Sequence, residues 1–247
     1  MRYLILTDIH ANLEALEACV ANARVRGFDR TLVLGDLVGY GADPNAVVSR
    51  VQELEPLAIV RGNHDKVACG LEPPEGFNVV AKSAALWTLN VLTPANREWL
   101  AALPPGPHAV DDLVEICHGS PFDEDAYIFD ELDVLRALKV SVRALCLFGH
   151  THYPVTFELT GNAFARADLS ASGEMSFALR DGSKYLINPG AVGQPRDGDP
   201  RAAYAIVDTA TRRVELYRLG YPVEEAQAKV IRAGLPEVLA ARLGMGR

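Results

Sequence analysis

Five apolar segments of this 247-residue chain each lead into a short polar segment that contains Asp, Asn or His, and this recurrence constrains the fold most strongly. The apolar segments span residues 2–7, 30–34, 56–60, 113–117 and 144–148, and the polar segments after them are Asp8-Ile9-His10, Gly35-Asp36, Gly62-Asn63-His64-Asp65, His118-Gly119 and Gly149-His150-Thr151-His152. Open α/β sheets place their functional side chains outside the carboxyl ends of the strands. We therefore expect five buried strands whose ends bring these polar segments together.

The rest of the chain shows helical periodicity and short strands in separate regions. Helices are expected at about residues 12–20, from 43–44 onward, over 79–92 and 93–103, and as a closing pair over 223–243. Short strands are expected at 155–159, 175–179, 184–187, 202–207 and 213–218, and their glycine turns favour a largely antiparallel sheet. No linker or internal repeat interrupts the sequence. We predict a single domain over residues 1–247, built of two facing sheets, with a helical insertion at about 71–107.

Charge and hydropathy exclude some classes of partner. The net charge is −8 and no block of Lys and Arg occurs, which argues against binding long nucleic acids. No apolar stretch approaches the roughly 18 residues of a membrane span, and the N-terminus is charged too early for a signal peptide. The four cysteines are widely spaced and read as reduced thiols. We expect a cytoplasmic protein without a membrane partner; the sequence allows, but does not require, a homo-oligomer.

The polar segments supply more candidate metal ligands than one ion needs. The seven candidates are Asp8, His10, Asp36, Asn63, His118, His150 and His152. They exceed the four ligands of a tetrahedral zinc site and suit two divalent ions that share a bridging carboxylate. Asp36 can bridge, because a carboxylate offers two oxygens. His64 is then free to act as an acid or to bind phosphate, with Asp65 to orient it.

Each segment also has an ordinary structural interpretation. An Asp before a helix is a common N-cap, and Asn-His-Asp or His-Thr-His sequences form polar turns. His108 lies outside the pattern, and we interpret it as a loop residue.

The order of the segments resembles that of the calcineurin-like metallophosphoesterase superfamily. Its motifs are Asp-x-His, Gly-Asp, Gly-Asn-His-Asp/Glu, His and Gly-His-x-His, and the resemblance spans residues 8–152, with a further familial segment near Asn188-Pro189-Gly190. It implies a four-layer α/β/β/α sandwich of two facing mixed sheets flanked by helices. It also implies one metal bound by Asp8, His10, Asp36 and His152, a second bound by Asp36, Asn63, His118 and His150, and His64 as the phosphate-facing acid.

One departure from the family separates this chain from the phosphoprotein phosphatases. Their Asp-Arg-Gly, whose arginine holds phosphate, is replaced here by Gly39-Tyr40-Gly41. The chain looks more like the small prokaryotic phosphodiesterase-like branch. Arg196 and Arg201, in the loop after Asn188-Pro189-Gly190, are candidates for the missing substrate-binding cation, although a solvated charged loop explains them equally well.

These observations predict an enzyme, a two-metal-dependent hydrolase of phosphate esters. We expect a phosphodiesterase acting on small phosphorylated or nucleotide-like substrates through a hydroxide held between two cations. Manganese is the first expectation for the metal, and iron, zinc, nickel and cobalt also suit the ligands. The alternatives are a phosphomonoesterase, phosphoprotein phosphatase or dinucleoside-polyphosphate phosphatase and, in another class, a non-catalytic metal-binding scaffold for protein interactions.

Overall fold

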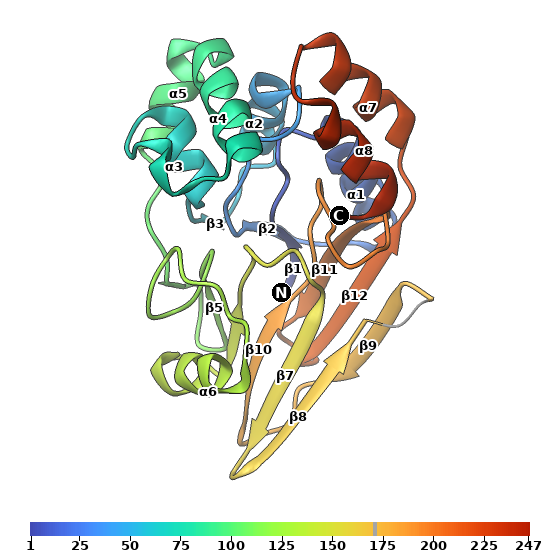
Figure 1. Ribbon diagram of the computed structural model, residues 1–247. Coiled ribbons are helices and arrows are strands. Elements are labelled where there is room, and N and C mark those ends of the chain that lie inside the picture. Colours follow the sequence, from blue (N-terminus) through green and yellow to red (C-terminus); the bar gives the residue numbers. More distant parts are fainter. Residues whose placement is uncertain (170–171) are drawn as a thin grey trace.

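The computed structural model describes residues 1–169 and 172–247. Within these residues the strands form two mixed sheets of six strands each, in the orders β3-β2-β1-β11-β12-β9 and β4-β5-β6-β10-β7-β8 (Figure 1). The strands are β1 (Arg2–Leu6), β2 (Arg30–Val33), β3 (Ala58–Ile59), β4 (His108–Ala109), β5 (Val114–Ile116), β6 (Leu145–Leu147), β7 (Val155–Thr160), β8 (Ala163–Asp168), β9 (Glu174–Ala178), β10 (Ser183–Asn188), β11 (Ala202–Asp208) and β12 (Arg213–Leu219).

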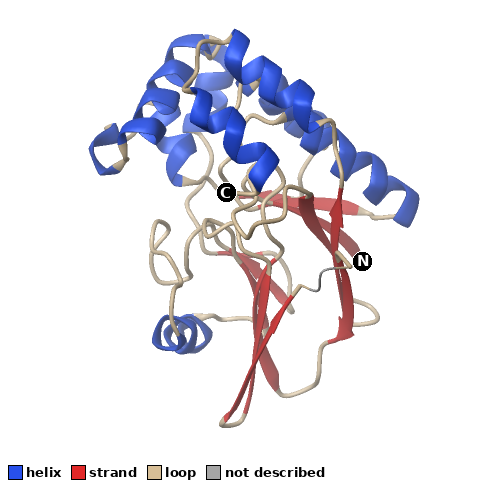
Figure 2. Cartoon of the chain, turned by 45° about the vertical axis from the view of Figure 1, so that its right-hand side comes forward, coloured by secondary structure: helices blue, strands red, loops and turns tan. Residues whose placement is uncertain are grey.

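The helices lie outside the two sheets; most of them gather at one end, and the helix over Glu131–Val140 lies apart from these, beside the strands (Figure 2). They are α1 (Leu13–Arg26), α2 (Pro44–Glu53), α3 (Asn63–Cys69), the short 3₁₀ helix η1 (Pro74–Gly76), α4 (Val79–Val91), α5 (Pro94–Ala101), α6 (Glu131–Val140), α7 (Val223–Arg232) and α8 (Glu237–Met245). Because α1 packs against β11 and α6 packs against β10, helices cover the outer face of each sheet. This confirms the predicted sandwich of two facing mixed sheets flanked by helices.

Alternation along the strands divides the apolar core into layers. On β1, Tyr3 and Ile5 point between the two sheets and pack with residues such as Ile116 from the other sheet. Their neighbours Leu4 and Leu6 point the other way, into the layer formed with α1 and α2. Because side chains of a strand alternate between its faces, a strand buried on both faces must be apolar throughout. This explains the uninterrupted apolar segments of the sequence.

The C-terminal strands pair with one another in antiparallel orientation, as the sequence suggested, but they are divided between the two sheets. Strands β11, β12 and β9 extend the first sheet, and β10, β7 and β8 extend the second. Strand β10 pairs parallel with β6 of the second sheet, and the next strand along the chain, β11, pairs antiparallel with β1 of the first sheet. The chain therefore crosses from one sheet to the other between β10 and β11. Local strand patterns carry no information on the partner strand, so this division could not be read from them.

Several elements differ from the sequence expectations. Strand β8 and helices α3 and α6 were not anticipated, and His108, expected in a loop, lies in the short exposed strand β4. Thr93 caps α5, which begins where the sequence predicted a helix, since its side chain accepts from the backbone N–H of Asn96. Asp43 does not cap α2 through its side chain; its carboxylate instead accepts a hydrogen bond from Lys229 Nζ at 2.6 Å.

The segment 71–107 contains η1, α4 and α5, which lie beside α3 in Figure 1. That residues 1–247 form a single domain with this segment as an insertion stays a prediction. Among the described residues, no helix combines the length and hydropathy that crossing a membrane requires.

Candidate metal centre

The polar segments at the strand ends converge, as the sequence predicted, and we call the seven candidate ligands together the candidate metal centre. Asp8, His10, Asp36 and His152 form one group, and Asp36, His118 and His150 form another, with the ligand atoms of each group within 4.8 Å of one another. Asp36 belongs to both groups. Asn63 lies beside the second, with its Oδ1 3.3 Å from His118 Nε2. All the Asp and His members are buried.

The backbone at these positions is strained. The left-handed region is occupied by Asp8 (φ 52°), His10 (φ 49°), Asp36 (φ 52°), His150 (φ 65°) and His152 (φ 61°). Such conformations cost about 1 kcal/mol or more each, and they persist only where surrounding contacts impose them. Hydrogen bonds between the loops do so here: the His10 N–H donates to the Asp36 carbonyl at 2.9 Å, and the His150 N–H donates to the Asp8 carboxylate at 3.1 Å. Strain concentrated on the polar positions indicates a functional site.

Gly62 brings the third polar segment into contact with the second. A Cβ atom built on Gly62 would overlap the Asp36 carboxylate and approach its backbone N–H at 2.5 Å. Only glycine permits this approach. The His64 N–H can therefore donate to Asp36 Oδ1 at 2.9 Å, which fixes one of the two carboxylate oxygens and leaves Oδ2 facing the histidines.

Three histidines are oriented by their outer ring nitrogens. Nδ1 of His10 donates to the Val38 carbonyl at 3.1 Å, that of His118 to the Leu34 carbonyl at 2.8 Å, and that of His152 to the Gln194 carbonyl at 2.5 Å. A carbonyl can only accept, so each Nδ1 carries the proton. Each Nε2 therefore points toward the interior of the site, where it can offer a lone pair to a metal once it carries no proton, the arrangement typical of metal-binding histidines.

The inward-facing atoms fit divalent cations. His10 Nε2 and His152 Nε2 lie 3.1 Å apart, and His118 Nε2 and His150 Nδ1 lie 3.1 Å apart. Asp36 Oδ2 is 3.5 Å from His10 Nε2 and 3.4 Å from His118 Nε2. Burial holds the pKa values of His10 and His152 well below their usual range, so their two Nε2 lone pairs face one another and repel unless a positive charge lies between them. Imidazole nitrogens with carboxylate and amide oxygens suit Mn, Fe, Zn and related ions.

Burial and the Asp36 carboxylate determine the protonation of the site. Burial lowers the pKa of His64 to about 4 and that of His150 to about 3, so both rings are neutral at pH 7. Burial also acts to lower the pKa of His118, but the adjacent Asp36 carboxylate outweighs it and raises that pKa to about 10. In the protein alone, a proton on His118 thus partly balances Asp36. A bound cation would displace it, because metal ligands must be deprotonated.

His64 faces a cavity beside the candidate metal centre. Its ring lies 4.4 Å from that of Tyr40 and 4.5 Å from that of Phe77, measured between centroids. It lines a cavity of about 320 Å³ that we call the polar cavity, whose rim includes Glu72 and Asp125. The position is compatible with a group that acts on a substrate rather than on a metal.

Asp65 does not orient His64, contrary to the expectation from sequence. Its carboxylate accepts hydrogen bonds from the backbone N–H groups of Gly62 at 2.9 Å, Leu37 at 2.9 Å and Val38 at 3.2 Å. It therefore ties the loop that carries Asp36 to the start of α3. The buried Nδ1 of His64 has no hydrogen-bond partner among the residues that the structure describes. Asp65 is a positioning residue for the Asp36 loop.

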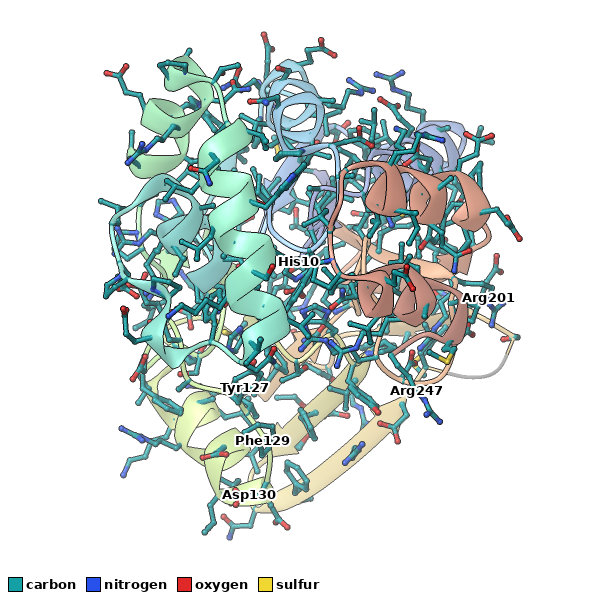
Figure 3. The ribbon with its side chains drawn as sticks, turned by 45° about the horizontal axis from the view of Figure 1, so that its top comes forward. His10, Tyr127, Phe129, Asp130, Arg201 and Arg247 are labelled. Carbon is teal, nitrogen blue, oxygen red and sulfur yellow. The ribbon has the colours of Figure 1, made fainter. Side chains whose placement is uncertain are left out.

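The structure separates the two candidate arginines. The Arg196 guanidinium donates to Gln194 Oε1 at 3.1 Å and to the Tyr40 hydroxyl at 3.4 Å, and its charge acts on His64, His150 and His152. Arg201 instead binds the Asp199 carboxylate at 2.6 Å. In Figure 3 Arg201 lies at the side of the molecule, whereas His10 lies near its centre.

Sequence reasoning missed the aromatic residues around the site. The Tyr127 ring lies against that of His150, with centroids 3.8 Å apart, and Tyr40 and Phe77 enclose His64. Tyr40 was considered only as part of a stretch that lacks arginine. Tyr127 lies in the loop after β5, and no local pattern in that loop signals its position.

Comparison with known proteins agrees with this geometry. A sequence model described as the calcineurin-like phosphoesterase superfamily domain matches residues 1–212. The chain is similar to protein MJ0912 of Methanocaldococcus jannaschii, with 36% identity over 252 residues that cover 98% of this chain and 97% of the relative.

Two solved structures are also similar. A metallophosphoesterase from Sphaerobacter thermophilus is 37% identical with a TM-score of 0.87, over 100% of both chains. Protein PH1004 from Pyrococcus horikoshii is 18% identical with a TM-score of 0.79, over 100% of this chain and 98% of that one, a likeness of fold. The chain therefore belongs to the calcineurin-like phosphoesterase superfamily and is a metal-dependent hydrolase of phosphate esters.

Proposed function

We propose that this protein is a phosphodiesterase that hydrolyses small phosphodiesters, with the candidate metal centre as its catalytic site. One observation carries the preference for diesters over monoesters. Two cavities adjoin the site on either side of Tyr127: the polar cavity, and a second of about 290 Å³ that we call the aromatic cavity. A phosphodiester has two substituents on phosphorus, and the two cavities offer each of them a place.

The ligand groups suggest how two cations would be held. We propose that Asp8, His10, Asp36 and His152 hold one, and that Asp36, Asn63, His118 and His150 hold the other. When bound, such a pair lowers the pKa of a water molecule and neutralises developing charge on phosphoryl oxygens. Manganese is our proposal for the ion, since the mixed oxygen and nitrogen ligands suit it.

His64 and Arg196 are the residues that we assign to the substrate. Arg196 is a permanent cation whose hydrogen-bond partners, Gln194 and Tyr40, are neutral, so its charge is available to a phosphate oxygen. It takes the place of the arginine that Gly39-Tyr40-Gly41 lacks. His64 lines the polar cavity, and we assign it to the oxygen of the leaving group. Its ring, neutral in the free protein, donates a hydrogen bond there, and it can act as an acid when the negative charge of a bound phosphate raises its pKa. Arg201, neutralised by Asp199, is left out of this assignment.

The substitution His64→Gln tests this assignment, because glutamine keeps polarity and approximate size. We expect two bound metals, as proposed for the wild-type protein, and about a 100-fold lower kcat for a dinucleoside monophosphate, a diester whose alkoxide leaving group, unlike p-nitrophenolate, needs a proton. Metal content is measured by inductively coupled plasma mass spectrometry. His108→Gln, a change at an exposed histidine of β4, is the matched control and should keep wild-type turnover.

Two results would contradict the proposal. Full activity of the His64→Gln protein would remove His64 from the reaction. A wild-type protein that binds metal and hydrolyses p-nitrophenyl phosphate but not the diester methyl p-nitrophenyl phosphate would be a phosphomonoesterase instead.

A cytoplasmic location is also our proposal. The structure gives all four cysteines as free and buried, which is typical of proteins from a reducing compartment.

A further inference from the structure

The loop between β5 and α6 presents two aromatic rings next to the candidate metal centre. Tyr127 and Phe129 stack with centroids 4.9 Å apart and an angle of 14° between the ring planes. Tyr127 is 39% exposed and Phe129 is 79% exposed. A phenylalanine side chain so exposed buries little apolar surface and therefore contributes little to the free energy of folding. Its position therefore calls for an explanation other than the stability of the fold.

These two rings form one wall of the aromatic cavity. Tyr153, which is 48% exposed, and the buried Phe157 also line it. Arg196 and Arg166 also line the cavity, and the Arg166 guanidinium is paired with the Asp168 carboxylate at 2.9 Å. The cavity thus combines flat apolar faces and a guanidinium plane with the positive charge of Arg196. The polar cavity has the opposite character, since Glu72 and Asp125 stand at its rim.

The aromatic cavity adjoins the candidate metal centre through Tyr127 and Arg196. Tyr127 lines both cavities and lies against the ring of His150. Arg196 lines the aromatic cavity, hydrogen-bonds Tyr40 and also interacts with the Tyr127 side chain. A phosphate at the metal centre beside Arg196 would therefore place one of its substituents in the aromatic cavity. In the view of Figure 3, Tyr127 lies between His10 of the candidate metal centre and Phe129 of the aromatic cavity.

We propose that the aromatic cavity binds the planar base of a nucleoside phosphate, as the part of the substrate that stays on the phosphate after hydrolysis. This inference rests on the proposed function. Aromatic side chains stack on any nucleobase through its π-face, and guanidinium groups add cation–π attraction. Of the two cavities, His64 lines the polar one and not the aromatic one, so the leaving group departs through the polar cavity. The substituent that stays on the phosphate then lies in the aromatic cavity. The product in the aromatic cavity is then a nucleoside monophosphate.

A second copy of the chain is the competing occupant of this exposed aromatic face. Three features favour a small ligand. The face is hollowed into a cavity, it carries two arginines, and its inner end reaches the catalytic groups. A protein interface would not need access to His150.

Calorimetric titration with AMP and with ribose 5-phosphate tests the proposal, because these ligands differ only by the base. For the wild-type protein with Mn²⁺, we expect AMP to bind about tenfold more tightly or better. The Phe129→Ala substitution should remove most of this ratio, while the Kd of ribose 5-phosphate changes by less than about twofold. Leu132→Ala, at a residue of α6 that is 76% exposed and does not line the cavity, is the matched control and should keep the wild-type ratio.

Tyr153→Ala is an independent test at a second residue of the cavity lining. It should also lower the ratio of AMP to ribose 5-phosphate affinity, so the result does not depend on the correct folding of a single variant. Equal affinities of the wild-type protein for the two ligands would overturn the proposal. A second contradicting result would be a wild-type protein that is dimeric and becomes monomeric on Phe129→Ala substitution without any change in AMP binding. This face would then be an interface between copies.

The outcome is distinguishable from failure of the proposed function. A protein that prefers AMP to ribose 5-phosphate, and loses this preference in the Phe129 variant, has the base site whether or not it hydrolyses methyl p-nitrophenyl phosphate. A protein that hydrolyses the diester with no preference for AMP is a phosphodiesterase without the base site.

Discussion

Two clusters of potential metal ligands lie close together in this fold, and they differ in their source of positive charge. In the candidate metal centre, carboxylate oxygens and unprotonated histidine nitrogens face one another. The second cluster, which we call the Lys66 cluster, consists of Arg61, Lys66, Glu72, Glu124 and Asp125. Carboxylate oxygens of its three acidic residues also lie within 4.8 Å of one another. Proximity of ligands therefore does not distinguish a metal site from an ion-pair network.

The Lys66 cluster contains its own cation. The Lys66 side chain is 1% exposed, and its Nζ lies 2.9 Å from Glu72, 3.2 Å from Glu124 and 2.5 Å from Asp125. Arg61 adds a second positive charge through Glu124 at 3.0 Å. The cluster is complete without an added ion, and it holds the loop that carries Tyr127 onto α3. The candidate metal centre has no such internal cation except a proton on His118. An added ion should therefore matter at one cluster only.

Removal of metal is the strongest test of this difference. After dialysis against a chelator, we expect turnover to fall to background, because the metals supply the nucleophile and the charge neutralisation. Saturating Mn²⁺ at about 100 times its Kd contributes about 2.7 kcal/mol per site to the free energy of unfolding, or about 5 kcal/mol for the two proposed sites. The melting temperature should therefore fall by about 10–20 °C on removal of the metals, measured by differential scanning calorimetry.

Readdition of Mn²⁺ is the control for this experiment. It should restore both the melting temperature and turnover. A chelated protein that retains full activity would show that the lone pairs facing one another do not mark a metal site.

Arg196 and Arg201 differ in the same way as the two clusters. A carboxylate of the protein neutralises Arg201, whereas the hydrogen-bond partners of Arg196 are neutral. Arg196→Gln should lower kcat/KM for methyl p-nitrophenyl phosphate by about 30-fold, the worth of a charged hydrogen bond to phosphate. Arg201→Gln should change it by less than about twofold, because Asp199 already neutralises Arg201. Steady-state kinetics of the two variants measure the difference, and equal losses would contradict it.

The sequence was sufficient to predict that the candidate ligands converge but not to describe how they are held. Their convergence could be predicted because uninterrupted apolar strands identify the strand ends, and α/β sheets collect their functional groups there. The left-handed backbone at Asp8, His10 and Asp36 could not, since it depends on hydrogen bonds between loops distant in sequence. The role of Asp65 was wrong for the same reason. Its three donors include Leu37 and Val38, which belong to another loop.

Missed elements of the fold have separate physical causes. Strand β8 is an exposed edge strand, Ala163–Asp168, with few of the β-branched residues that signal strands. Helix α6 did carry a readable signal, because Asp130 caps it by accepting from the Asp133 N–H at 3.0 Å. The Lys66 cluster joins α3 to the loop after β5, and such ion pairs between distant segments have no local signature in sequence.

Lys66→Met tests the other side of the comparison, and its expected effect is the smallest. Methionine keeps most of the buried volume but leaves Glu72, Glu124 and Asp125 without their shared cation. Breaking a buried pair costs about 3–5 kcal/mol, and we expect about 2 kcal/mol here because the carboxylates are partly exposed. The melting temperature should fall by about 4–8 °C. Lys139→Met, at an exposed position of α6, should leave it unchanged.

The same variant should acquire a property that the wild-type protein lacks at this place. With Lys66 gone, three carboxylates surround a position without a cation, so millimolar Ca²⁺ should recover part of the lost melting temperature in Lys66→Met but not in Lys139→Met. The two metals of the candidate metal centre should stay bound, and KM should rise only a few-fold as the Tyr127 loop loosens. Loss of those metals in the Lys66 variant would mean that the two clusters form one electrostatic unit, and the distinction between them would fail.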